Sequence, residues 1–281
     1  MTALDRYQAG EVTLLSDAQV QGGVTFAFTE RTGGVSAGQW ASLNLGSACG
    51  DDPAAVVENR RRALAAIGAE AWEGALVSPH QVHGDEFIHV SSAEPAALAE
   101  AREKGAAGAD AVVCTVPHVP VMLCFADCVP VVLVAPGGFA IAHSGWRGTI
   151  ARIAGKAARE LARQAGRAAS DVSAYIGPHV GACDYEVSDE LLARFVAEFG
   201  DGADAGERHL DLAFAVRQAL LDEGVSPGSI ACCEDSTASN TGRFFSWRAE
   251  SGQTGRHAAV AVMGSDASSS WASAPIVEGR V

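Results

Sequence analysis

Histidine and cysteine residues stand beside turns at three places in the 281-residue sequence, where their side chains can point into a cleft. The segment "SPHQVHGD" carries His80 and His83, "FADC" ends at Cys128, and "IAHSGWRG" carries His143. Zinc accepts imidazole and thiolate ligands in tetrahedral geometry, and three protein ligands leave a fourth position open for water or substrate. The pattern therefore predicts a catalytic metal site.

The expected strands explain how Cys128 and His143 can meet although they are separated in the chain. Apolar runs at 129–135 and 139–143 are separated by a Pro-Gly-Gly turn, which favours neighbouring strands. Strand ends joined by a short turn lie on one rim of a sheet. The same residues also permit a Cys128 nucleophile activated by His143, with Asp127 or another acceptor orienting the ring. Metal content distinguishes the two hypotheses, because zinc would consume the thiolate.

Arginines in glycine-containing segments are the candidates for binding an anion. Arg147 lies in "HSGWRGT", and Thr149 is expected to begin a helix whose first amides favour phosphate or a carboxylate. A surface arginine at a first helical turn explains the same segment equally well. Arg248 and Arg256 flank "AESGQTG" and are either binding residues or exposed loop cations.

Apolar periodicity predicts an α+β fold, a single domain in which helices cover central mixed β-sheets. We expect a hairpin within 12–34 and strands at 74–78, 86–91, 109–116, 119–125, 129–135, 139–143, 172–177, 229–233 and 257–263. Helices are expected at 52–68, 149–166, 188–200 and 210–224. The domain is placed at 1–264, and the Ser-rich segment 265–281 is expected to be a flexible tail.

The charge balance argues against nucleic acid and membranes as partners. With 34 acidic and 20 basic residues the formal net charge is −14, which repels phosphate backbones and anionic lipid. The longest basic cluster, Arg60 to Arg62, lies in the helix expected at 52–68 and is interpreted as a solvated helix face. No signal segment and no apolar run of about 20 residues is found, so a cytoplasmic location is expected. Seven dispersed cysteines are expected to be reduced.

Nine ordered segments resemble the bacterial laccase-domain family, whose members are described as multicopper polyphenol oxidases, purine nucleoside phosphorylases and a peptidoglycan editing factor. The segments are "FTERTGGVSAG", "SLNLG", "HQVHGD", "ADAVVC", "ADCVPVVL", "AHSGWRGT", "IGPHVGACDYEV", "CCEDST" and "FFSWRAESGQTGR". The resemblance implies an α+β fold related to the deamidating-toxin, cysteine hydrolase-like fold.

The same resemblance implies that His83, Cys128 and His143 are the ligands of a zinc-dependent enzyme, with copper as the other metal to consider. It implies phosphorolysis of adenosine, inosine, guanosine and methylthioadenosine, and deamination of adenosine. The expected small-molecule partners are thus a purine nucleoside and phosphate. Arg147 is a candidate catalytic residue, and Asn44 and Arg248 are candidate substrate contacts. A turn-capping amide is the other role that fits Asn44.

Three other functions stay open at this point: copper-dependent oxidation of phenols, a cell-wall precursor editing hydrolase with a Cys-His site, and a non-catalytic metal-binding partner protein. Phenol oxidation normally requires several coppers, which one His2Cys triad does not supply. Two departures from the family pattern bear on substrate range. Ala48 and Cys49 stand where a histidine is common, and Ala249 follows Arg248 where a second arginine is frequent.

Overall fold

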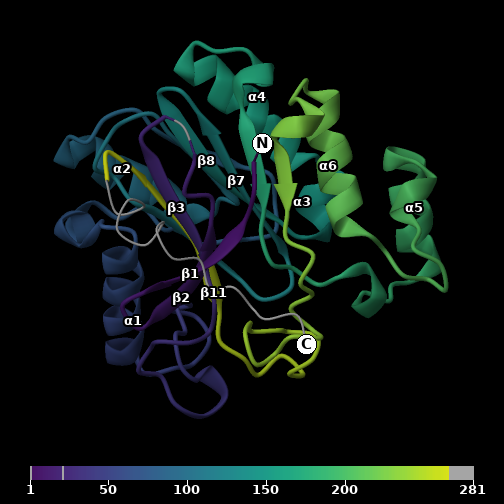
Figure 1. Ribbon diagram of the computed structural model, residues 1–281, viewed down its shortest axis with the longest axis horizontal. Coiled ribbons are helices and arrows are strands. Elements are labelled where there is room, and N and C mark those ends of the chain that lie inside the picture. The colour runs from purple at the N-terminus through teal and green to yellow at the C-terminus, as the bar shows by residue number, and fades with distance from the viewer. Residues whose placement is uncertain (1, 21, 266–281) are drawn as a thin grey trace.

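The computed structural model describes residues 2–20 and 22–265, and in this part of the chain the strands form two sheets (Figure 1). The antiparallel sheet has the order β1 (Asp5–Ala9), β2 (Val12–Ser16), β3 (Val24–Thr29), β11 (His257–Met263) and β6 (Val121–Phe125). The mixed sheet has the order β10 (Ile230–Cys232), β9 (Ser173–Ile176), β7 (Val129–Ala135), β8 (Gly138–Ser144), β5 (Ala111–Cys114) and β4 (Phe87–Val90). The expected α+β class is confirmed.

Six α-helices belong to the described residues. They are α1 (Pro53–Ala66), α2 (Pro95–Ala107), α3 (Trp146–Ile150), α4 (Ile153–Ala165), α5 (Asp189–Phe199) and α6 (Leu212–Asp222). The start of α1 follows from its sequence: Asp52 is the N-cap and accepts the N–H of Ala54 at 3.0 Å, and Pro53 occupies the first turn. Most of the expected strands and helices are present within a few residues of their predicted bounds.

The elements stack in four layers, with the two sheets in the middle. Phe28 of β3 and Phe125 of β6 share one buried core with Val132 of β7 and Tyr175 of β9, so the sheets pack face to face. Helices α4 and α6 cover the outer face of the mixed sheet, α5 packs beside α6, and α1 covers the outer face of the antiparallel sheet (Figure 1). Each helix buries one apolar stripe, as in Ala154, Ala157, Ala158 and Leu161 of α4.

Two predicted elements are wrong in detail. The helix expected at 149–166 is divided into α3 and α4, because Arg152 adopts a left-handed conformation with φ of 60°. Ion pairs from Arg152 to Glu198 at 2.7 Å and to Asp222 at 2.8 Å hold the side chain at this break. The segment 74–78 contains the end of a 3-10 helix and a single bridge from Val77 to Val121 instead of a strand. Strand β1 and helix α2 were not predicted.

Of the predicted tail, 265–281, only Ser265 belongs to the described residues. The hydroxyl of Ser265 donates a hydrogen bond to the carbonyl of Ile67 at 2.7 Å. Residues 266–281 lie outside the described residues. Among the helices that are described, none has both the length and the apolar character required to cross a bilayer.

Candidate metal centre

Strand register brings Cys128 and His143 to one edge of the mixed sheet. Strands β7 and β8 are antiparallel neighbours, and Pro130 pairs with His143. Cys128 directly precedes β7, so it lies beside the end of β8 at which His143 stands. The structure therefore places both residues on one rim, as the turn between their strands predicts.

Asp110 lies next to His143 because β5 pairs with β8, with Ala111 opposite Ala142. Its Oδ1 lies 2.7 Å from Nδ1 of His143, and its carbonyl accepts the backbone N–H of His143 at 2.7 Å. This bond leaves Nε2 of His143 for a metal, which is the usual arrangement around a histidine ligand. The side chain of Asp110 has no solvent exposure.

The same carboxylate holds the loop that carries His83. Asp110 accepts the backbone N–H groups of Val82, His83 and Gly84 at 3.2, 3.0 and 2.7 Å. His83 has a φ of 61°, a conformation that non-glycine residues rarely adopt and that functional sites tolerate when the surroundings impose it. One buried side chain therefore positions both imidazoles.

His83, Cys128 and His143 are close enough to bind one ion. Their donor atoms all lie within 4.8 Å of one another, and no other group of three or more such residues occurs among the described residues. In a tetrahedral zinc site the ligand atoms are about 3.3–3.8 Å apart, so small side-chain movements suffice. A Cβ atom at Gly145 would lie 3.0 Å from Sγ of Cys128 and 3.1 Å from Cδ2 of His83, so glycine keeps this space open. The donor set fits zinc.

The electrostatics of the three residues favour the thiolate. Burial raises the pKa of Cys128, but His143 and then His83 outweigh burial and bring it to about 6. Burial lowers the pKa of His143, whereas Cys128 and Asp110 raise it, with a net value of about 9. Without a metal, the pair is thus a thiolate beside an imidazolium.

The metal ligands open onto a cavity of about 750 Å³. Aromatic side chains in its wall are Phe125, Tyr185 and Trp247, which offer ring faces to a flat ligand. The volume falls within the range of small-molecule sites, and the segment 124–128, which links the two sheets, forms part of the wall.

The cavity is positively charged although the chain as a whole is acidic. Its lining includes Arg60, Arg102, Arg248 and Arg256. Asp127 supplies the one carboxylate among the described lining residues, and this group already accepts the Thr237 hydroxyl at 2.7 Å and the Arg248 N–H at 2.6 Å. The cavity therefore suits an anionic ligand.

The remaining predicted residues lie in different places. Arg248 lines the cavity, with its guanidinium carbon 5.1 Å from the centre of the Tyr185 ring. Asn44 is fully buried outside the lining, and its side-chain oxygen accepts the N–H groups of Gly46 at 3.0 Å and Arg256 at 2.8 Å. Its amide thus fills the turn-capping role.

Arg147 belongs to α3, and its guanidinium carbon lies 4.3 Å from the centre of the Trp146 ring. It is exposed and is not among the cavity-lining residues. The helix begins at Trp146 instead of Thr149, so Arg147 stands in its first turn. A catalytic role for Arg147 stays a prediction from the sequence.

Sequence reasoning missed the residue that orients His143. Asp127 was considered for this role, but its carboxylate binds Thr237 and Arg248, and Asp110 is the acceptor. The available signal was the polar Asp110 directly before the apolar run "AVVC", at the same strand edge as the ligands. Tyr185 and Trp247 were also missed, because loop aromatics carry no periodic pattern.

Comparisons with known proteins agree with the fold. The family model described as multi-copper polyphenol oxidoreductase laccase matches residues 25–264. A purine nucleoside phosphorylase of Deinococcus radiodurans is 37% identical over 242 residues, covering 84% of this chain and 88% of that protein. The adenosine deaminase RL5, from an unknown prokaryotic organism, is 30% identical over 218 residues, covering 74% and 82% respectively. The crystal structure of YlmD from Geobacillus stearothermophilus has a TM-score of 0.79 and 32% identity, covering 92% of this chain and 99% of that one. This chain belongs to the multi-copper polyphenol oxidoreductase laccase family.

Proposed function

We propose that this protein is a zinc-dependent purine nucleoside phosphorylase that also deaminates adenosine. The observation that carries the proposal is the convergence of His83, Cys128 and His143 within 4.8 Å at the wall of a positively charged cavity. Relatives named purine nucleoside phosphorylase and adenosine deaminase support both reactions. Zinc is favoured over a multicopper centre because the described residues contain one such ligand group.

Phosphorolysis and deamination place different demands on the site. In phosphorolysis a phosphate oxygen bonds to C1′ of the ribose while the bond from C1′ to N9 breaks, and the electron pair and a proton go to the purine. In deamination a water oxygen bonds to C6 of adenine while the bond from C6 to the exocyclic nitrogen breaks, and ammonia leaves. Zinc supplies Lewis acidity at its open fourth position when bound.

The residues of this chain have distinct roles in these two reactions. His83, Cys128 and His143 would hold the ion, and Asp110 fixes the tautomer of His143 through Nδ1. Tyr185 lies in the cavity wall, where its ring offers a face to the purine. We assign a substrate contact to Arg248, because its exposed guanidinium lies beside Tyr185.

A thiol hydrolase is the second candidate, and the orientation of His143 favours it. Asp110 bonded to Nδ1 of His143, with Cys128 beside the same ring, reproduces the nucleophile, base and orienting group of a cysteine hydrolase. An editing hydrolase acting on cell-wall precursors would use this arrangement. In that case Cys128 would attack substrate instead of binding metal.

One experiment separates the two candidates. The zinc and copper content of the purified protein is measured, and adenosine is then incubated with and without phosphate while free adenine and inosine are followed. We expect one zinc per chain, adenine release that requires phosphate, and inosine formation that does not. Absence of both products would reject the proposed function.

The variant Cys128→Ala tests the ligand assignment in the same assay. It is expected to lose zinc and both activities, because a methyl group cannot bind the metal. The matched control is Cys183→Ala, which changes an exposed cysteine outside the cavity lining. Full zinc occupancy in the Cys128→Ala variant would show that the thiol is not a ligand.

A further inference from the structure

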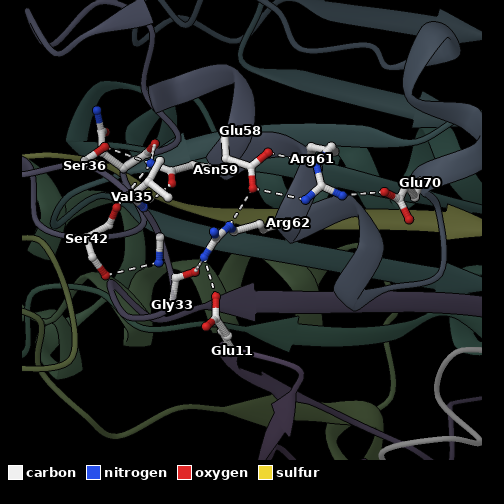
Figure 2. A network of polar contacts seen from close by, with 12 residues as sticks. Glu11, Gly33, Val35, Ser36, Ser42, Glu58, Asn59, Arg61, Arg62 and Glu70 are labelled. Carbon is white, nitrogen blue, oxygen red and sulfur yellow. Dashed lines mark hydrogen bonds and ion pairs between the residues drawn. The ribbon is translucent and has the colours of Figure 1, made fainter. Parts of the chain in front are cut away.

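Three consecutive arginines of α1 have different environments. Arg61 pairs with Glu58 at 2.8 Å and also with Glu70, and Arg62 pairs with Glu58 at 2.8 Å and also with Glu11 (Figure 2). These two form the solvated helix face that the sequence predicts. Arg60 departs from that prediction, because it lines the cavity and forms no ion pair with a carboxylate of the described residues.

Arg256 reaches the same part of the cavity from the opposite side of a buried turn. Leu45, in this turn, accepts the Nε–H of Arg60 at 2.9 Å through its carbonyl and donates its own N–H to the carbonyl of Arg256 at 2.9 Å. The side-chain oxygen of Asn44 accepts the backbone N–H of Arg256 at 2.8 Å. The turn therefore fixes the backbone of Arg256 relative to the side chain of Arg60, while the guanidinium of Arg256 donates to the carbonyls of Thr254 at 3.0 Å and Gly255 at 2.8 Å.

Two thiols lie near the side chains of these arginines. The thiol of Cys124 lies 3.4 Å from the Leu45 carbonyl, which also accepts from Arg60. A Cβ atom at Gly46 would lie 2.6 Å from Sγ of Cys49 and 2.7 Å from Cγ of Arg256, so Cys49 and Arg256 approach each other across Gly46. Both thiols line the cavity and are free.

The charges in this part of the cavity are not neutralised within the described chain. Neither Arg60 nor Arg256 forms an ion pair with a carboxylate there, and Asp51 is engaged by the Ser36 hydroxyl at 2.6 Å and the Asn44 amide at 2.9 Å. Partly buried guanidinium groups are normally paired, because an unpaired charge away from water is costly. Two of them without a carboxylate indicate an anionic ligand, and planar guanidinium groups bind phosphate through two parallel hydrogen bonds.

We propose that Arg60 and Arg256 form the phosphate subsite of the cavity, with Cys49 and Cys124 lying against the bound phosphate, while the nucleoside occupies the part beside the metal ligands. This inference rests on the proposed function. Cys124 and Cys128 are four residues apart, so the chain between them spans at most about 14 Å and both ends lie within reach of one nucleoside and phosphate. The side chain of Gln81 holds the backbone of Cys124 at the cavity wall: its Oε1 accepts the N–H of Cys124 and its Nε2 donates to the carbonyl of Cys124, both at 2.8 Å.

The kinetic test compares the two reactions, because only phosphorolysis uses phosphate. In Arg60→Gln and Arg256→Gln we expect the KM for phosphate to rise about 10- to 100-fold, the effect of losing a charge-assisted hydrogen bond. Adenosine deamination without phosphate should fall much less than phosphorolysis in the same variants, because that reaction uses no phosphate. Arg61→Gln is the matched control on the same helix, since Arg61 points at Glu58 and Glu70.

A binding test keeps the subsite testable if the chain shows no phosphorolysis. The full chain is labelled with N-ethylmaleimide at constant ionic strength, with inorganic phosphate or chloride, and the rate at each cysteine is followed by mass spectrometry. Phosphate at ten times its Kd should slow labelling of Cys49 about tenfold. The exposed Cys183 and Cys232 serve as internal references and should not respond. Protection should be lost in Arg60→Gln and retained in Arg61→Gln.

Two results would overturn the subsite. One is a phosphate KM in both arginine variants that stays within about twofold of the unchanged protein. The other is labelling of Cys49 and Cys124 that phosphate does not slow. Protection by phosphate together with absent phosphorolysis would reject the proposed function while supporting an anion subsite at these arginines.

Discussion

Asp110 Oδ1 lies 2.7 Å from Nδ1 of His143, and both side chains are buried. The same oxygen also accepts the backbone N–H of His83 at 3.0 Å. A single carboxylate is thus connected to two of the three candidate metal ligands. Because such partners fix the tautomer and direction of a histidine, the metal affinity of this site should depend on Asp110.

Asp110→Asn is expected to weaken zinc affinity about 10- to 100-fold, the usual effect of losing the partner of a histidine ligand. Zinc competition with a chromophoric chelator gives the affinity without reference to activity. Asp85→Asn serves as control, because Asp85 lies on the same loop and pairs with Lys156 at 2.5 Å. Equal zinc affinity in the Asp110→Asn variant and the control would show that Asp110 is not required to position His143.

Gly145→Ala should also reduce zinc affinity, for a steric reason. The new methyl group would lie 3.0 Å from Sγ of Cys128 and 3.1 Å from Cδ2 of His83, so both ligands would have to move. Gly242→Ala is the matched control, because a Cβ there meets nothing within 4 Å. Zinc titration of both variants is the measurement, and an unaffected affinity in Gly145→Ala would place the metal elsewhere.

The reactivity of Cys128 in the metal-free protein should follow its lowered pKa. Because the pKa is about 6, alkylation by iodoacetamide should reach its plateau near pH 7 and fall about tenfold per unit below pH 6. In His143→Ala the imidazolium is lost while burial remains, so the pKa should rise and labelling at pH 7 should slow. A pH profile of labelling, read by mass spectrometry, checks both expectations. The same profile in the two proteins would exclude His143 as the cause.

His257 should make the fold less stable in acid. It is fully buried, and neither ring nitrogen has a hydrogen bond within the described residues. Burial, and after it the charge of Arg256, lowers the pKa of His257 from 6.5 to about 3, against an opposing effect of the Pro178 backbone. Between these values only the unfolded chain binds the proton. The free energy of unfolding therefore falls by about 1.4 kcal/mol for each pH unit below 6.5.

The variant His257→Phe removes this proton and keeps a ring beside Phe244, whose centre is 5.7 Å from that of His257. Denaturant unfolding of both proteins at several pH values between 4 and 7 gives the difference in free energy. For each pH unit of acidification, we expect the free energy of unfolding of the variant to rise by about 1.4 kcal/mol relative to that of the unchanged protein. Parallel pH curves would show that folding does not lower the pKa of His257.

The two departures from the family pattern now have positions in the structure. Cys49 lines the cavity beside Arg256, so the change lies in the wall of the cavity that carries the candidate metal ligands. Glu250 follows Ala249, and its carboxylate accepts the N–H of Ser246 at 3.0 Å and pairs with Arg31 at 3.0 Å. This residue thus organises the loop that presents Arg248.

The sequence by itself determined the class of fold and the positions of most strands and helices, and it singled out His83, Cys128 and His143 as candidate metal ligands, a role that stays a prediction. The fold predictions are confirmed because apolar periodicity and turn residues are local, and because two strands joined by a short turn must return to the same edge of a sheet. For the same reason the proximity of Cys128 and His143 could be foreseen.

Only the tertiary structure decided the role of Asp110 and the direction of Arg60. Asp110 meets His143 through the pairing of β5 with β8, a long-range register that no local pattern encodes. Successive residues of a helix point about 100° apart. The way in which α1 packs against the antiparallel sheet therefore decides that Arg60, of the three arginines, faces the cavity. The sequence shows that the arginines of α1 form a charged cluster, whereas the packing of the helix decides which of them faces the cavity.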